Sequence, residues 1–327
     1  MTTNEKIARI RQLMARDQVQ AVIIPSGDPH MSEYFSEHWK TRRFVSGFTG
    51  SVGTYVITEN ASGLWVDGRY YVQAEKQIAD SEAVLFRASE PDCPTFSQYL
   101  LDNLAPNSVV GLNGKLFSLS MMEQMQQLFA QKGITLNIQA DYGNDIWEDR
   151  PAEEYTPAYY FDEKYCGKSA AQKLSEVRDA LAKQGCDALV VGRLDNSNWL
   201  FNVRANDIPN SPIAISYGFV SGDQAVLFTA LSRVSAQAAE QLAKNGVTLR
   251  EYEDIYPFLS SLQTDAHVLC DPDEVNYLLY NQMQNNSHLT LVKGVDPIPM
   301  MKAVKNETEI ANTRLAYLKD GCAEAEF

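Results

Sequence analysis

The sequence predicts an α/β protein of two tandem domains, each with a mixed β-sheet and flanking helices. Three observations lead to this prediction. Helical and strand-like hydrophobic patterns alternate along the chain, and one helix–turn–strand pattern occurs twice, 167 residues apart. A polar segment with two prolines separates the two occurrences. The 327 residues, 45 % of them hydrophobic, suffice for two ordinary cores.

The repeated pattern begins near the N-terminus. Residues 4–17 carry apolar side chains at helical spacing, and residues 21–24 form a β-branched run, which predicts a helix followed by a buried strand. A second helix and the run 188–191 repeat this order. The helical positions correspond at the same offset: Ile7, Ile10 and Met14 in one helix, Leu174, Val177 and Leu181 in the other. We also expect residues 54–58 to correspond to 225–229.

The remaining elements are expected to alternate between helix and strand in both halves. Strands are expected at 52–58, 63–66, 83–87 and 248–252, and helices at 95–104, 118–131, 232–243 and 272–284.

Three glycines recur at every third residue around the start of the first of these strands: Gly47, Gly50 and Gly53. The spacing suits a tight loop whose backbone approaches another group closely. It is not the G-x-G-x-x-G dinucleotide fingerprint, and Ser51 does not lie in G-x-S-x-G. We therefore disfavour a nucleotide site and favour a role in packing.

Proline-containing segments mark the domain boundaries. The polar stretch 149–157 cannot continue a helix or a central strand, so we expect a boundary near residue 155. A second break at residues 297–299 leads to Asn306 and Glu309, which resemble a capping box at a helix start. The expected division is 1–155, 156–298 and 299–327.

The last predicted helix carries an apolar stripe formed by Ala311, Leu315, Leu318 and Cys322. A helix of this length is marginally stable without packing. It must therefore lie back on the second domain or pack against a partner outside these residues. We favour the second alternative, in which the chain is a truncated piece of a longer protein.

Composition limits the classes of function. A net charge of −14 disfavours binding to nucleic acids or to anionic membrane surfaces. The chain has neither a signal-peptide pattern nor 18 consecutive apolar residues, which favours a soluble, cytoplasmic protein. The five scattered cysteines suggest neither a disulfide framework nor a zinc knuckle, and the four histidines form no H-E-x-x-H. The residues by themselves indicate no catalytic or metal site.

Several motifs nevertheless resemble a known family. The residues are Pro25-Ser26-Gly27-Asp28-Pro29-His30, Ser32-Glu33-Tyr34, Phe44-Val45-Ser46-Gly47-Phe48-Thr49-Gly50-Ser51 and Asp67-Gly68-Arg69-Tyr70-Tyr71. In this order they resemble the N-terminal domain of three-domain Xaa-Pro aminopeptidases (aminopeptidase P) of the creatinase/prolidase superfamily. Residues 144–151 resemble the first interdomain link, 194–209 the signature loop of the second domain, and 301–310 the entry into the third.

The resemblance implies two tandem creatinase-type N-terminal domains. In that family the third domain, of pita-bread fold, holds two divalent metal ions, typically manganese. It removes the N-terminal residue that precedes proline, so the expected partner is a peptide with proline at its second position. The present chain would then be a non-catalytic N-terminal fragment without a cofactor of its own, and its domains would shape substrate access and assembly. The resemblance also allows a homodimer.

Two arginines match positions that the family associates with substrate binding. The arginine of the family's Asp-Gly-Arg turn maps onto Arg69, which could instead pair with Asp67. Arg204 lies in a second candidate patch with Asn202 and Asp207, followed by Ala205 where the family usually has glycine.

Two other functions remain open from the sequence. One is a stand-alone peptide-binding or dimerisation module without catalytic activity. The other is a member of the same superfamily that acts on a substrate other than a peptide, since fold does not fix function.

Overall fold

The computed structural model describes residues 1–327. Contacts within the chain define two compact units. The first comprises Met1–Glu153 together with Asn276–Leu278, and the second comprises Glu154–Val275 together with Leu279–Phe327. None of the helices combines the length and the hydropathy that a membrane crossing requires.

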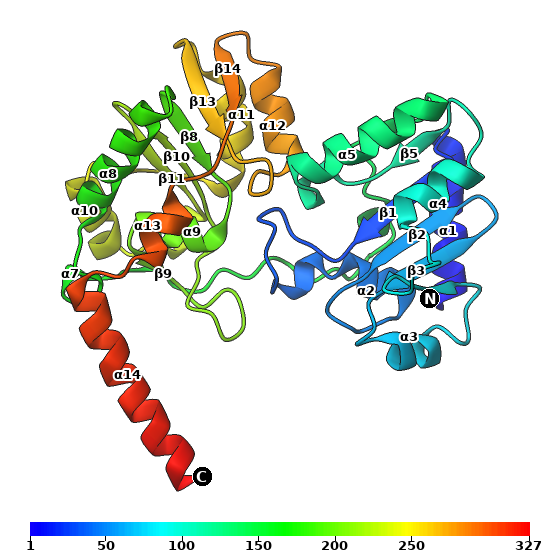
Figure 1. Ribbon diagram of the computed structural model, residues 1–327, viewed down its shortest axis with the longest axis horizontal. Helices are drawn as coiled ribbons and strands as arrows, with labels where there is room; N and C mark the ends of the chain where they lie inside the picture. The colour runs from blue at the N-terminus through cyan, green and yellow to red at the C-terminus, as the bar shows by residue number, and fades with distance from the viewer. The chain divides into compact units, whose positions relative to one another are not determined.

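The first unit contains a mixed six-stranded sheet in the order β4-β3-β2-β1-β5-β6 (Figure 1). β2 is antiparallel to β1 and β3, whereas the remaining neighbours are parallel. The strands are β1 (Ala21–Pro25), β2 (Thr54–Thr58), β3 (Ser62–Val66), β4 (Val84–Arg87), β5 (Val109–Gly111) and β6 (Thr135–Asn137).

Helices cover both faces of this sheet, because side chains alternate between the faces along each strand. On β1, Val22 and Ile24 join one core with α1, while Ala21 and Ile23 join the other with α4 and α5. The helices are α1 (Thr3–Arg16), α2 (Thr41–Ser46), α3 (Tyr71–Gln77), α4 (Phe96–Asn103), α5 (Leu119–Phe129) and α6 (Tyr142–Asp145), with 3₁₀ turns η1 (Glu37–Trp39), η2 (Gly114–Leu116) and η3 (Ala130–Lys132).

The second unit contains a sheet with the same plan, in the order β12-β11-β10-β8-β13-β14. β10 is antiparallel to β8 and β11, and the other neighbours are parallel. The strands are β8 (Ala188–Val191), β10 (Tyr217–Ser221), β11 (Ala225–Phe228), β12 (Thr248–Arg250), β13 (Ala266–Cys270) and β14 (Leu289–Lys293), beside a separate pair β7 (Tyr159–Tyr160) and β9 (Val203–Arg204).

The second sheet is also covered on both faces. Leu189 and Val191 of β8 pack in the core that includes α8 and α9, whereas Ala188 and Val190 pack in the core that includes α11 and α12. The helices are α7 (Glu163–Cys166), α8 (Ala170–Lys183), α9 (Leu194–Leu200), α10 (Ala236–Lys244), α11 (Ile255–Ser261), α12 (Tyr277–Gln284), α13 (Ile298–Ala303) and α14 (Glu307–Glu326), with 3₁₀ turns η4 (Leu231–Arg233) and η5 (Tyr252–Asp254).

These sheets confirm the predicted α/β class with a mixed sheet in each half. The repeat is confirmed for its first helix and strand, since α1 and α8 lie 167 residues apart, as do the starts of β1 and β8. The expected match of 54–58 with 225–229 is wrong. The sheet orders make β10 the counterpart of β2, whereas β11 is the counterpart of β3.

Three further expectations differ from the structure at helix starts. The helix expected from residue 272 begins at Tyr277, because Asp271–Asn276 form a turn after β13. The helix expected from residue 232 begins at Ala236, where Ser235 caps it. The expected break at 297–299 contains the start of α13, since proline is tolerated in the first helical turn.

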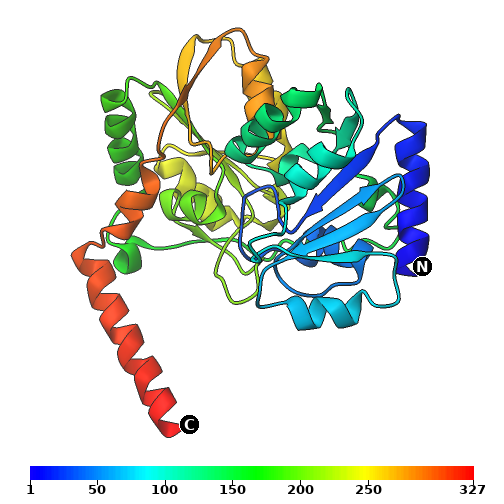
Figure 2. The same ribbon diagram turned by 45° about the vertical axis from the view of Figure 1, so that its right-hand side comes forward.

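The helix α14 begins as predicted, at a capping box formed by Asn306 and Glu309. None of its residues is buried, and the stripe of apolar side chains is exposed to solvent throughout. Its packing partner within the second unit is α7, near its N-terminal end. The helix therefore does not lie back on its own domain, and in both views it extends away from that domain (Figures 1 and 2).

Candidate functional site

Arg69 lies on the turn that follows β3 in the first unit. Its Nε and Nη2 donate to Asp67 Oδ1 and Oδ2 at 3.0 and 2.8 Å, and its backbone N–H donates to Oδ1 at 3.0 Å. The hydrogen bond from Arg69 holds the pKa of the Asp67 carboxyl below its usual value. The pairing considered from the sequence is therefore present, but it leaves the Arg69 side chain 68 % exposed.

The ring of Tyr70 supports this turn. Its centroid lies 5.2 Å from the guanidinium carbon of Arg69, and its hydroxyl lies 2.6 Å from Ser51 Oγ. Phe48 meets the same ring edge-on, with centroids 5.7 Å apart. A Cβ at Gly50 would lie 2.2 Å from Phe48 Cζ, so the close approach expected at this glycine is made to aromatic rings.

A buried arginine fixes the glycine loop from inside. Arg42 Nη1 donates to Phe48 O at 2.6 Å, Nη2 donates to Gly50 O, and Nε donates to Ser26 Oγ at 3.0 Å. None of these partners is a carboxylate, and burial lowers the pKa of Arg42 to about 10. In the sequence Arg42 stands next to Arg43, and nothing in the pattern indicates which of the two is buried.

Arg204 lies on β9 in the second unit. Its Nη1 donates to Asn198 O and Val203 O at 2.6 and 2.8 Å, and the guanidinium carbon stands 4.9 Å from the centre of the Phe161 ring. Burial lowers the pKa of this arginine. The guanidinium is therefore held in one orientation while its side chain stays partly exposed.

Asn202 does not belong to a surface patch. It is fully buried with a positive φ of 53°, and its Nδ2 donates to Lys168 O at 2.9 Å. Its Oδ1 accepts a bond of 2.6 Å from Lys173, another fully buried residue. The left-handed conformation thus falls on Asn202 and not on Ala205, so alanine introduces no strain at its position.

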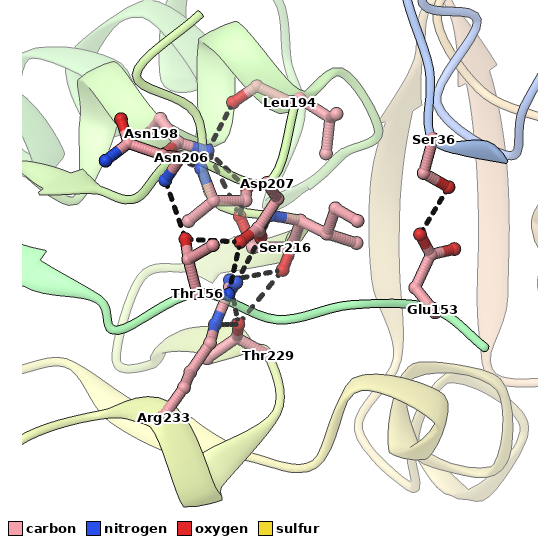
Figure 3. Close-up of polar contacts among 12 residues, drawn as sticks. Ser36, Glu153, Thr156, Leu194, Asn198, Asn206, Asp207, Ser216, Thr229 and Arg233 are labelled. Carbon is pink, nitrogen blue, oxygen red and sulfur yellow. Dashed lines mark hydrogen bonds and ion pairs between the residues drawn. The ribbon is translucent and has the colours of Figure 1, made fainter. Parts of the chain in front are cut away.

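Asp207 is likewise internal and forms the centre of a buried network (Figure 3). It accepts hydrogen bonds from the Thr156 backbone N–H and hydroxyl, both at 2.8 Å, from the Ile215 N–H at 2.7 Å, and from Arg233. Arg233 also donates to Thr229 Oγ1 and to the Ile215 carbonyl. This network joins the start of the second unit to the segment before β10.

The expected second patch is therefore wrong for Asn202 and Asp207, which are buried, and of its three residues only Arg204 is partly exposed. The structure contains no group of three or more His, Cys, Asp or Glu side chains placed to hold a metal ion. The candidate binding groups are thus Arg69 in the first unit and Arg204 in the second.

Comparison with known proteins places both halves in one family. A family model described as Creatinase/Prolidase N-terminal domain matches residues 6–140, and a second model with the same description matches residues 149–309. Together they confirm the two creatinase-type domains expected from the sequence motifs.

Similar curated proteins are named as aminopeptidases. Aminopeptidase P2 of Arabidopsis thaliana is 33 % identical over 100 % of the chain, which covers 50 % of that protein. Xaa-Pro aminopeptidase 1 of Dictyostelium discoideum is 32 % identical over 99 % of the chain, which covers 52 % of it. The chain therefore spans about half the length of the curated relatives it matches.

A solved structure has the same fold across the whole chain. It is the X-prolyl aminopeptidase of Caenorhabditis elegans, described as a cytosolic enzyme with a di-nuclear active site. The TM-score is 0.92 at 27 % sequence identity, and the match covers 100 % of the present chain and 55 % of the nematode protein.

Proposed function

Since both halves of the chain belong to the creatinase/prolidase N-terminal domain family, we propose that they are the non-catalytic N-terminal domains of a cytoplasmic Xaa-Pro aminopeptidase. The observation that carries this proposal is the match of the entire chain to about half of several such enzymes. The enzyme would remove the N-terminal residue from peptides with proline at the second position. The two domains would shape access of the peptide and contribute to assembly, including a homodimer.

The catalytic metal centre is assigned to residues outside 1–327. The donor groups of this chain do not fit a centre of two divalent ions, because no three candidate ligands converge. We propose two such ions, manganese by preference, in a further domain that residues 299–327 enter. The chain of 327 residues would then be inactive alone.

The first experiment compares the 327-residue chain with the product of the complete reading frame that encodes it. Both are assayed on an Xaa-Pro peptide with manganese, and again after chelation of the metal. We expect manganese-dependent release of the first residue by the longer protein only. Cleavage by the 327-residue chain, with contaminating peptidases excluded, would refute the non-catalytic assignment, and an inactive longer protein would refute the peptidase assignment.

Arg69 and Arg204 are the proposed substrate-binding residues. Each presents a guanidinium in a fixed orientation, Arg69 through Asp67 and Arg204 through two backbone carbonyls. A guanidinium fork held in this way can donate to a peptide carbonyl or carboxylate with little loss of side-chain entropy. Arg69 is the stronger candidate because it is the more exposed.

The role of Arg69 is tested in the longer protein with Arg69→Ala. A hydrogen bond from a charged group contributes about 1.5–3 kcal/mol, so kcat/KM should fall by roughly 10- to 100-fold. Arg87→Ala is the matched control, because Arg87 is an exposed arginine of the same unit that lies near the Tyr71 ring and pairs with Glu75. An equal fall of kcat/KM in Arg69→Ala and Arg87→Ala would exclude a specific role of Arg69 in substrate binding.

A further inference from the structure

Acidic side chains gather at one edge of the second sheet. β8, β13 and β14 run parallel, so their carboxyl ends reach the same edge. Asp195 follows β8, Asp271 and Glu274 follow β13, and Asp296 follows β14. The short helix α13 begins two residues after Asp296, at Ile298, and packs against α9.

Asn196 joins two of these carboxyl groups. Its Nδ2 donates to Glu274 Oε2 at 2.9 Å and to Asp296 Oδ2 at 3.1 Å. Glu274 and Asp296 thus meet at one amide nitrogen, which places their carboxyl groups close enough for a hydrogen bond with each other when one of them is protonated. Two carboxyl groups can form such a bond only when one of them carries a proton, because an ionised carboxylate has no hydrogen to donate.

The surroundings determine which group holds the proton. Asp296 is 4 % exposed, and its Oδ1 accepts the Ile298 N–H at 2.7 Å, which favours its ionised form. Burial raises the pKa of Asp296 to about 6, whereas burial and the charge of Asp296 raise the pKa of Glu274 to about 8. Near neutral pH the two carboxyl groups therefore hold one proton between them, and the Ile298 N–H on Asp296 favours Glu274 as its carrier.

Four other charged residues lie around the Glu274–Asp296 pair: Arg193, Asp195, Asp271 and Lys302. Arg193 on the α9 side favours the ionised form of Glu274, and Asp271 opposes it. Asp271 Oδ2 also accepts the Asp296 N–H at 2.9 Å. On α13 itself, Lys302 pairs with Asp195 and donates to Asn196 Oδ1 at 3.1 Å.

These contacts fasten α13 at both of its ends. The Asp296–Asn196–Glu274 group holds the N-terminal end, and Lys302 holds the opposite end to α9. Between them, Ile298 is fully buried in the core that α9 shares, and Met301 packs against that core. The segment between β14 and α14 is thus held to its domain by α13, whose N-terminal end is bound by titratable groups, whereas α14 itself is held through α7.

We propose that Glu274 and Asp296 form a pH-sensitive latch, which holds α13 against α9 while they share a proton and releases it when both are ionised. Two adjacent buried carboxylates repel each other, so loss of the shared proton replaces a hydrogen bond with repulsion. The consequence of release is that α13 detaches from α9 and the connection between β14 and α14 becomes free to move, while α14 stays in contact with α7.

The sign of the pH dependence follows from linkage. An open segment exposes Glu274 to water, where its pKa is about 4.3, so the closed form binds more protons above that pH. The opening constant should therefore rise with pH up to about pH 8 and level off above it, because both forms are then ionised. The protonation of Asp296 affects the opening constant only below about pH 6.

The test is hydrogen exchange of the α13 amides in the 327-residue chain at pH 6.5, 8 and 9, expressed as protection factors. Between pH 6.5 and 8 the opening constant should rise by about tenfold per pH unit, then level off. In Glu274→Gln the side-chain amide donates to Asp296 at every pH, so the rise should disappear. Glu240→Gln, at an exposed pair with Lys244, should keep the wild-type dependence.

Asp296→Asn provides a second variant in case the first perturbs folding, and α8 protection reports that the domain is intact. Without its negative neighbour, Glu274 ionises at lower pH although its burial remains, so the rise between pH 6.5 and 8 should be weaker than in the wild type. A wild-type protection factor that is independent of pH would overturn the latch. So would an undiminished rise in both variants.

Discussion

Replacing Asp207 by alanine tests whether the buried network fixes the segment before β10. Asp207 accepts four hydrogen bonds, two of them from Thr156 and one each from Ile215 and Arg233. The substitution leaves the Arg233 side chain, 2 % exposed, as a buried charge without its carboxylate. Removing one partner of a buried ion pair costs about 3–5 kcal/mol, and we expect the free energy of unfolding to fall by that amount.

The assay is urea unfolding of the 327-residue chain, combined with hydrogen exchange to distinguish the two units. Protection should fall in β8 and β10 and stay unchanged in β1 and β2, which belong to the first unit. The double substitution Asp207→Leu with Arg233→Met removes both charges and should recover part of the loss. A loss below about 1 kcal/mol, typical of an exposed pair, would refute the reasoning, as would a double variant with purely additive losses.

Two further predictions concern single positions. Gly50→Ala should destabilise the first unit by about 1–3 kcal/mol, because the new Cβ would overlap Phe48 and Tyr70. The control is Gly222→Ala, whose new Cβ would have no atom within 4 Å and should leave the stability nearly unchanged. Thermal unfolding of both variants measures the difference. Burial lowers the pKa of Lys173 to about 8, so the unfolded chain, in which a lysine has a pKa of about 10.4, binds more protons between these values. Stability should therefore rise with pH in that window, by up to about 3 kcal/mol, and Lys173→Met should remove this rise in urea titrations at pH 7.5 and 9.5.

Features encoded by local periodicity could be predicted from the sequence. The buried faces of α1 and α8 are visible in the sequence as apolar residues at helical spacing. The start of α14 is predicted by the capping box of Asn306 and Glu309. The apolar pattern does not predict the strand β10, because Gly218 interrupts it. A Cβ at Gly218 would lie 2.7 Å from Phe201, so this glycine is required by packing that only the folded chain reveals.

The candidate sites depend on pairings between distant residues, which periodicity does not report. Arg233 was expected inside a helix, yet it lies in a 3₁₀ turn and reaches Asp207, 26 residues away. Asn196 contacts Asp296 across 100 residues. Family motifs indicated Arg69 and Arg204, but only the structure shows how each guanidinium is held.

The identical strand orders of the two sheets indicate how the two domains arose. Two sheets of identical strand order and direction within one chain are the expected product of duplication of an ancestral gene segment. The turn after β3, which presents Arg69, then descends from the same ancestor as the turn after β11, which begins at Thr229. One copy exposes a charged side chain, whereas in the other Thr229 is buried and bonded to Arg233. With this origin, the two turns have diverged in burial, one facing solvent and the other lying in the interior.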